Sequence, residues 1–331
     1  MKRSASWDGC GVVALLVVLA ACREKPAPVP PAASAPTTAP ALPPGEAYLI
    51  TPTGKVWYRL SGSGGGTPVI LIHGGPGFPS YYMKPLEGLG SARPVVRYDQ
   101  LGAGKSDHVT DTTLFNIPHF VEELETLRGR LGYEKVDLYG ISWGSIVAVE
   151  YYRRHPEHVK ALVLGGAALD IPAWERHARE LLRTLPDSMQ RAIQTREAEQ
   201  KYDAPDYQAA LGQFYSMYVW RRPNEVDLDS TLKQAGEALY NYMQGPSEFT
   251  ITGTLKRYDA TPYLSQIKVP LLYTTGEFDE ANPVTIRRFA SLTPGARVVV
   301  FAGAGHVTPW DAPEENLKAV GAFLAEVDRA R

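Results

Sequence analysis

Short apolar runs alternate with amphipathic stretches along most of the chain after residue 45. Such runs are typical of parallel strands that are buried on both faces. They occupy residues 68–72, 94–98, 135–139, 159–164, 269–274 and 297–301. Between the second and third runs, apolar residues recur every three or four positions from Ile117 to Leu131, which predicts an amphipathic helix packed on a sheet.

A hairpin and two helices complete this pattern. Residues 47–51 and 55–60 are expected to form a hairpin, because Pro52-Thr53-Gly54 between them is a turn signal. Helices are expected at 283–292 and 313–328. Alternation of strands and helices predicts an α/β fold, with a mostly parallel sheet covered by helices on both faces.

The alternation stops between residues 168 and 254, where the chain becomes polar and amphipathic, without an apolar run of the core type. This predicts a helical cap inserted into the α/β core. The expected division is a first part of the core at 45–167, the cap at 168–255 and a second part of the core at 256–331. With 331 residues, 44% of them hydrophobic, the chain is long enough to bury such a core.

The first residues have the composition of an export signal. Lys2 and Arg3 precede an apolar stretch, 11–21, that is too short to cross a membrane as a helix. The ending Leu19-Ala20-Ala21-Cys22 resembles the bacterial lipobox. We therefore expect residues 1–21 to be a lipoprotein signal peptide and Cys22 to be lipidated; the alternative is an ordinary signal peptide with an incidental cysteine.

Residues 22–44 are rich in Pro and Ala and are expected to act as an extended tether. Arg23, rather than Asp, follows the cysteine, and by resemblance to Gram-negative lipoproteins this favours the outer membrane, facing the periplasm. Cleavage would remove Cys10 and leave Cys22 as the single cysteine of the mature chain. A disulfide framework is then not expected.

Charge and motifs narrow the possible ligands. A formal net charge of −2 and the lack of a basic stripe argue against nucleic acid as a partner. The glycines at 62–66 precede a strand rather than a helix, and residues 102–106 do not form a phosphate-binding loop, because Asp99 stands where its first glycine is needed. HExxH and Cys/His clusters are absent from the sequence. No metal and no cofactor are expected, and the oligomeric state is left open.

Four motifs indicate nucleophilic catalysis. Gly140-Ile141-Ser142-Trp143-Gly144 lies between a strand-like and a helix-like stretch, as a nucleophile elbow does. The loop His73-Gly74-Gly75-Pro76-Gly77 follows an earlier strand. Asp279 and His306 each follow a later one. Ser, then Asp, then His is the chain order of the α/β-hydrolase triad.

Each triad residue then has an expected role. Ser142 is the nucleophile, and His306 takes its proton and later returns it to the leaving group. Asp279 holds the imidazole of His306 in the productive tautomer. Asp99 is the competing carboxylate, but its place before the nucleophile strand favours a role in structuring a loop.

The oxyanion formed during acyl transfer needs preorganised donors. The backbone N–H groups of Trp143 and Gly75 are the candidates, since glycines around position 75 allow the backbone to approach closely. His73 is expected to hold this loop rather than to catalyse.

From about Gly45 to its C-terminus the chain resembles the proline iminopeptidases, in particular the tricorn-interacting aminopeptidase type. The resemblance rests on the oxyanion loop, the elbow and three further segments: Tyr98-Asp99-Gln100-Leu101-Gly102, residues 245–254 and Gly276-Glu277-Phe278-Asp279-Glu280. It implies that Glu248 and Glu280 bind the substrate's N-terminal ammonium. Tyr240, Tyr242 and Trp310 are candidates to line the site. Leu101, where many relatives have a basic or aromatic residue, and the lipoprotein leader depart from the family pattern.

The expected function is therefore that of a metal-independent serine exopeptidase, which releases an N-terminal residue, preferably proline, from short peptides with a free N-terminus. A carboxylesterase or another small-acyl hydrolase on the same triad is the alternative, and Glu248 with Glu280 discriminates between them. A binding lipoprotein without turnover is a third possibility, disfavoured because the triad is complete.

Overall fold

The computed structural model describes residues 44–330. The expected signal peptide, Cys22 and nearly all of the tether lie outside these residues. An eight-stranded sheet, in the order β1-β2-β4-β3-β5-β6-β7-β8, forms the centre of the described part. Its strands are β1 (Gly45–Thr51), β2 (Gly54–Ser61), β3 (Val69–Ile72), β4 (Val95–Tyr98), β5 (Val136–Ile141), β6 (Val159–Gly165), β7 (Leu271–Gly276) and β8 (Arg297–Phe301).

The sheet is mostly parallel. β1 and β2 form the expected antiparallel hairpin and β2 pairs antiparallel with β4, whereas the pairs from β4 through β3 to β8 are parallel. Every residue of β3, β4 and β5 is buried, which explains why these strands are apolar runs rather than alternating ones. The predicted fold class is confirmed.

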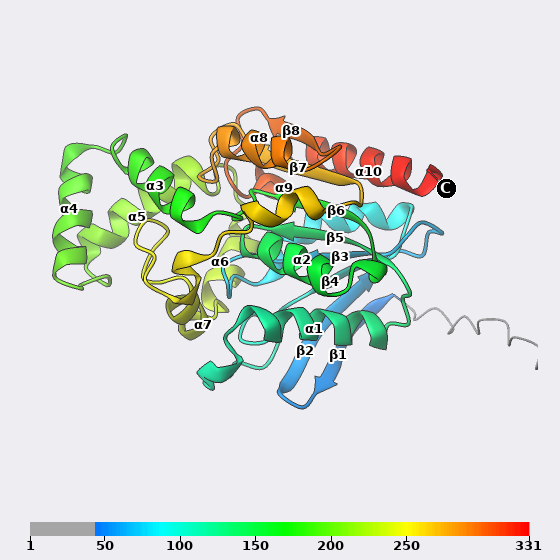
Figure 1. The fold of residues 1–331 in the computed structure, drawn as a ribbon. Coiled ribbons are helices and arrows are strands. Elements are labelled where there is room, and N and C mark those ends of the chain that lie inside the picture. The colour runs from blue at the N-terminus through cyan, green and yellow to red at the C-terminus, as the bar shows by residue number, and fades with distance from the viewer. Residues whose placement is uncertain (1–43, 331) are drawn as a thin grey trace, which may run out of the picture. The chain divides into compact units, whose positions relative to one another are not determined.

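Helices cover both faces of the sheet (Figure 1). α1 (Ile117–Arg130), α2 (Trp143–Arg154) and α8 (Pro283–Leu292) lie on one face, and the 3₁₀-helical segment η1 (Ser80–Ser91) and α10 (Pro313–Arg329) lie on the other. The side chain of Asn116 caps α1 by accepting the N–H of His119, which supports the start of the amphipathic run.

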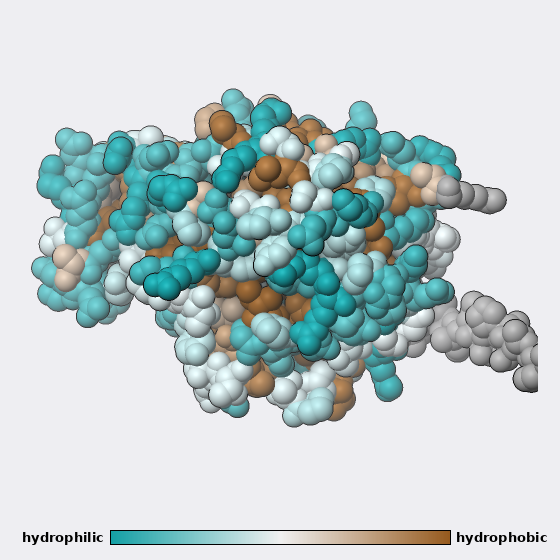
Figure 2. Space-filling model, viewed as in Figure 1, coloured by the Kyte–Doolittle hydropathy of each residue, from teal (hydrophilic) through white to brown (hydrophobic). Residues whose placement is uncertain are grey.

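Between β6 and β7 the chain forms helices and no strand of the sheet. The helices are α3 (Ile171–Leu182), α4 (Asp187–Ala198), α5 (Pro205–Tyr218), α6 (Glu225–Lys233) and α7 (Glu237–Met243), followed by η4 (Thr254–Arg257) and η5 (Thr261–Gln266). α3 to α7 lie within residues 168–255, where the sequence predicts the cap. On the face shown in Figure 2, the outer surface of α3, α4 and α5 is mostly hydrophilic. The remaining short helices are η2 (Thr112–Leu114), η3 (Pro156–His158) and α9 (Thr308–Asp311).

The connectivity of the sheet determines where a site can form. From β3 the chain first crosses to β4 on one side, and it then returns to place β5 on the other side. The loops that follow β3 and β5 therefore diverge and leave a crevice at the carboxyl ends of these two strands, the position at which open α/β sheets bind ligands. Of residues 44–330, no helix is both long and apolar enough to cross a membrane.

Candidate active site

Ser142 occupies the sharp turn between β5 and α2. Its φ is 55° and its ψ is −123°, a conformation that side-chain-bearing residues rarely adopt. The turn depends on both flanking glycines: a Cβ on Gly140 would lie 2.1 Å from the Gly144 oxygen, and a Cβ on Gly144 would lie 2.1 Å from the Ile72 oxygen. The geometry is that of a nucleophile elbow, which presents the serine hydroxyl above the carboxyl ends of the strands.

Asp279 and His306 are in direct contact. The Nδ1 atom of His306 lies 2.7 Å from Oδ1 of Asp279. The same carboxylate accepts the Ala281 N–H at 2.7 Å and the Thr275 hydroxyl at 2.8 Å, so its position is fixed from several sides. The contact orients the imidazole with Nδ1 bonded to the carboxylate and with Nε2 available to a nucleophile.

The charges of this pair reinforce each other. Burial by itself raises the pKa of Asp279, but the charge and hydrogen bond of His306 outweigh it and the pKa lies below its ordinary value. For His306, burial favours the neutral form, but the Asp279 carboxylate outweighs this and raises the pKa. An imidazolium formed during a reaction is therefore stabilised by Asp279.

Ser142 and His306 line the same pocket, which also reaches Gly75. His306 Nε2 is buried and has no hydrogen-bond partner in the described structure, so the hydroxyl of Ser142 is not yet bonded to it. Catalytic contacts of this kind are often long without substrate and tighten when it binds. Gly166, with φ of 47°, leaves room for the imidazole, because a Cβ there would lie 2.4 Å from its ring.

The two candidate oxyanion donors are on loops that meet at Ser142. Trp143 is the first residue of α2, so its N–H has no acceptor within that helix. Gly75 has a φ of 110°. Its neighbour Gly74 donates its N–H to the Tyr82 hydroxyl at 2.5 Å, which anchors the loop. Within residues 44–330, neither the Gly75 nor the Trp143 N–H donates a hydrogen bond to another protein group.

His73 and Asp99 hold loops, as expected. The Gln100 N–H donates to His73 Nε2 at 2.9 Å, and the Gln100 amide oxygen accepts the Trp143 indole N–H at 2.8 Å. Asp99 accepts the Ser80 N–H at 2.9 Å and the Lys105 N–H at 2.9 Å. Sequence reasoning did not identify Tyr82 or Gln100, because their contacts are made across the fold and leave no local motif.

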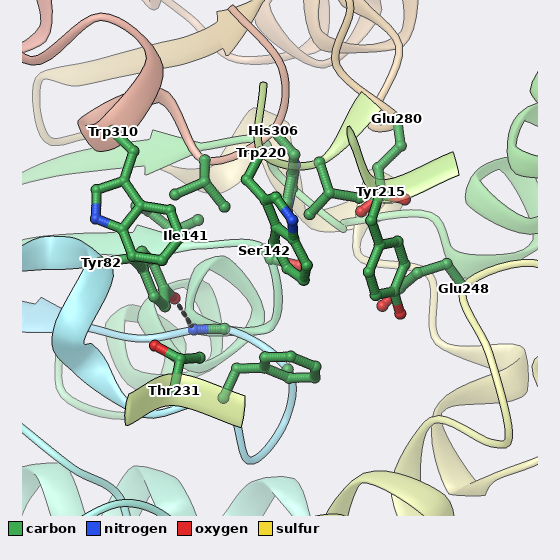
Figure 3. A pocket seen from close by; sticks show the side chains of 15 residues that line it. Tyr82, Ile141, Ser142, Tyr215, Trp220, Thr231, Glu248, Glu280, His306 and Trp310 are labelled. Carbon is green, nitrogen blue, oxygen red and sulfur yellow. Dashed lines mark hydrogen bonds between the residues drawn. The ribbon is translucent and has the colours of Figure 1, made fainter. Parts of the chain in front are cut away.

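Glu248 of the cap and Glu280 of the core line one pocket with Ser142 (Figure 3). Glu280 is only 2% exposed, and its Oε2 has no hydrogen-bond partner in the described structure. Glu248 accepts the Tyr240 hydroxyl at 2.6 Å. Neither carboxyl group is in a salt bridge with any residue from 44 to 330.

Burial dominates the protonation of these two carboxyl groups. It raises the pKa of Glu248, although the Tyr240 hydroxyl opposes the change. Burial and then the neighbouring Glu248 carboxylate raise the pKa of Glu280 well above its ordinary value. A cation placed between them would restore both to the ionised form, so the pair has the electrostatic character of a binding site for a cation.

The pocket has an empty volume of about 520 Å³. A smaller hollow of about 240 Å³ continues from Ser142 and Glu248 and is walled by Trp143, Trp174 and Ile171. Trp310 lines the main pocket, whereas Tyr242 is 41% exposed and is not among its lining residues. Within the described chain, no cluster of three or more His, Cys, Asp or Glu side chains is arranged to hold a metal ion.

Known proteins share this fold and much of this sequence. A family model for the alpha/beta hydrolase fold matches residues 67–313. A proline iminopeptidase of Heyndrickxia coagulans is 39% identical over 285 residues, which cover 85% of this chain and 99% of the relative. The crystal structure of a Mycobacterium smegmatis proline iminopeptidase superposes with a TM-score of 0.79 at 30% identity, over 86% of this chain and 99% of that one.

The crystal structure of VinJ is similar as well, with a TM-score of 0.82 at 30% identity, over 86% of this chain and all of that one. These matches span nearly the whole of the described residues. They agree with the motifs on which the sequence resemblance rests. The chain belongs to the proline iminopeptidase family of the α/β-hydrolase superfamily.

Proposed function

We propose that the protein is a serine exopeptidase that releases an N-terminal residue, preferably proline, from short peptides. The observation that carries the proposal is the pair of carboxyl groups, Glu248 and Glu280, in the same pocket as Ser142 and without a cationic partner in the described structure. Buried carboxyl groups without a cationic partner are costly to ionise, and a cationic ligand would pair with them. The names of the relatives support the same activity.

A peptide N-terminus matches this pair. Its α-amino group has a pKa near 8 and arrives largely as a cation. Held between Glu248 and Glu280, it would place the first residue beside Ser142. The hollow next to Glu248, walled by Trp143 and Trp174, adjoins Ser142 and is the place we propose for the side chain of that first residue.

The chemistry follows from the contacts of His306. Its Nε2 takes the proton of Ser142 while the hydroxyl oxygen attacks the first carbonyl carbon, and the N–H groups of Gly75 and Trp143 bind the oxyanion. His306 then gives the proton to the departing amine as the C–N bond breaks, which leaves an acyl-enzyme. Water, deprotonated by the same imidazole, attacks the ester, and the proton returns to Ser142 as the free amino acid leaves.

The carboxylate pair provides a direct test. Glu248→Gln and Glu280→Gln keep the side-chain shape and remove the charge, so they leave a substrate ammonium poorly paired in a dry pocket. We expect kcat/KM for a Pro-arylamide to fall by about 30-fold to 1,000-fold, while hydrolysis of an uncharged aryl acetate changes only a few-fold. N-acetylated Pro-arylamide should be a poor substrate of the unmodified protein.

Two controls complete the measurement. Glu277→Gln changes an exposed carboxylate three residues from Glu280 that accepts the Gly303 N–H, and it should alter neither activity. Ser142→Ala should lower kcat for both substrates by about three orders of magnitude or more. Equal losses for both substrates in the glutamine variants would favour the esterase alternative, and unchanged Pro-arylamide turnover would refute the proposed amine site.

A further inference from the structure

The pocket has a second half of different chemistry. Figure 3 shows Glu248, Glu280 and Tyr215 on one side of Ser142, and Tyr82, Trp310 and Thr231 on the other. The rings of Tyr82 and Trp310 pack edge to face with centroids 6.1 Å apart. All three of these side chains are largely buried: 5% of Tyr82, 7% of Trp310 and 2% of Thr231 is exposed.

The two hydroxyl groups of this half are already engaged within the protein, whereas the indole Nε1 of Trp310 is buried without a hydrogen-bond partner in the described structure. The Tyr82 hydroxyl oxygen accepts the Gly74 N–H, and the Thr231 hydroxyl donates to the Asp227 carbonyl oxygen at 2.7 Å. Among the other residues that line the pocket, Phe78, Val307 and Trp220 are apolar or aromatic. Glu248, Glu280 and His306 are the only Asp, Glu, His, Lys or Arg side chains among the residues that line the pocket in the described structure.

The position of the amine site fixes the direction of a bound peptide. If the N-terminal ammonium lies between Glu248 and Glu280, the carbonyl carbon lies at Ser142, and the leaving amine must extend away from the carboxylates. The side of Ser142 opposite to them is the half formed by Tyr82, Trp310 and Thr231.

On this basis, and resting on the function proposed above, we propose that Tyr82, Trp310 and Thr231 form the subsite for the second residue of the substrate and select an uncharged aromatic or large aliphatic side chain there. Such a side chain gains by leaving water for an aromatic wall. A charged side chain would lose its hydration without meeting a partner. A glycine in the second position would leave the subsite unfilled.

The subsite is assembled from distant parts of the chain. Tyr82 belongs to η1, Trp310 to α9 of the core and Thr231 to α6 of the cap. Trp220, which follows α5, packs against Tyr215 with ring centroids 4.7 Å apart and connects the two halves of the pocket. The preference for the second residue therefore depends on how the cap lies on the core.

The test compares peptide amides that differ only in the second residue. Proline release from Pro-Phe-NH₂, Pro-Leu-NH₂, Pro-Gly-NH₂, Pro-Asp-NH₂ and Pro-Lys-NH₂ is measured with the full chain. We expect kcat/KM for the Phe and Leu peptides to exceed that for the Gly peptide by about 10-fold to 100-fold. The Asp and Lys peptides should be no better than the Gly peptide.

Two variants assign the preference to the subsite. The Phe-to-Gly ratio is kcat/KM for Pro-Phe-NH₂ divided by kcat/KM for Pro-Gly-NH₂, and the Lys-to-Asp ratio is defined in the same way. Trp310→Ala should reduce the Phe-to-Gly ratio to about threefold or less. A general loss of activity affects both substrates equally and cancels in this ratio. Thr231→Asp should raise the Lys-to-Asp ratio by about tenfold or more, because it places a carboxylate in the subsite. Tyr242→Ala, which removes an exposed aromatic side chain of the cap, is the matched control and should leave both ratios unchanged.

The outcomes separate this inference from the function on which it rests. If proline is released from all five amides with ratios within threefold, or if Trp310→Ala keeps the Phe-to-Gly ratio, the subsite is wrong and the exopeptidase stands. If neither the amides nor a Pro-arylamide is cleaved, the proposed function itself is wrong and the subsite is withdrawn with it.

Discussion

Glu280 is a residue whose proposed role in binding comes at the expense of stability. Its carboxyl group is buried next to Glu248, and both facts raise its pKa well above the ordinary value of 4.5. In the unfolded chain the group ionises near pH 4.5, whereas in the folded protein it keeps its proton to a higher pH. Between these two values the folded state binds more protons than the unfolded state, so stability falls as the pH rises.

Glu280→Gln should remove this pH-dependent cost. The amide resembles the protonated carboxyl group and does not ionise, so the variant should gain in stability relative to the unmodified protein as the pH rises above 4.5. We expect its Tm to be higher by about 2 to 4 °C at pH 8 and by less at pH 5, measured by thermal unfolding without substrate. Glu277→Gln should show no such trend, and a difference that shrinks with rising pH would refute the proposed burial cost.

The sequence allowed some site residues to be proposed more readily than others. Ser142 stands in a five-residue motif that needs a glycine at each end, so it is visible in the sequence. Asp279 and His306 follow strands in the chain order of the triad. Glu248 and Glu280 have no local signature and were proposed only through the family resemblance. Tyr82 and Gln100 act through contacts with residues 8 and 43 positions away, so no pattern along the chain reveals them.

At the scale of elements, the sequence predicted the strands well and their first residues less well. The runs 68–72, 94–98 and 269–274 each contain a proline at or near the start, and β3, β4 and β7 begin just after Pro68, Pro94 and Pro270. Proline has no N–H for the ladder, so the regular strand starts one residue later. η1 was not predicted, since its two tyrosines, its single proline and its two glycines show neither a helical nor a strand period.

One contact between elements links the cap to the oxyanion loop. The N–H of Gly236, just before α7, donates to the Gly77 carbonyl oxygen at 2.8 Å, two residues after the candidate donor Gly75. Gln234 supports the contact, because its carbonyl oxygen accepts the Gly104 N–H at 2.9 Å. The backbones approach so closely that a Cβ on Gly236 would lie 2.1 Å from the Gly102 oxygen.

Gly236→Ala should therefore impair catalysis, although residue 236 is not one of the proposed substrate-binding residues. The new methyl group must push the cap segment away from Gly102 and loosen its bond to Gly77, which shifts the oxyanion loop. Because oxyanion donors act mainly in the transition state, we expect kcat to fall by about 10-fold to 100-fold, with a smaller change in KM.

The cap provides a matched control for this substitution. Gly212 lies within α5, and a Cβ there would have no heavy atom within 4 Å. Gly212→Ala should leave kcat unchanged and favour the helix by about 1 kcal/mol. The measurement is the steady-state kinetics of both purified variants with a Pro-arylamide, together with their Tm values. A normal kcat in Gly236→Ala would show that the cap does not position the loop.

At the scale of the whole molecule, catalysis and location are assigned to separate parts of the sequence. All candidate catalytic and substrate-binding residues lie between positions 75 and 310, within the described chain. The candidate anchor, Cys22, lies outside it. We propose that the mature protein begins at a lipidated Cys22 on the periplasmic side of the outer membrane, supported by the sequence Leu19-Ala20-Ala21-Cys22, by Arg23 after it and by the Pro/Ala-rich residues that follow.

Cys22→Ser should therefore change where the protein is found and not how it works. A serine has no thiol to accept a lipid, so we expect the variant to leave the membrane fraction or to stay unprocessed, while kcat/KM per mole of purified protein stays within about twofold. Fractionation and the intact mass of the N-terminal peptide measure the first effect, and Pro-arylamide kinetics measure the second. Cys10→Ser, which alters a cysteine within the expected signal peptide, is the matched control and should remain lipidated. An unmodified protein without acyl mass in the soluble fraction would refute the anchor and leave the proposed catalytic site untouched.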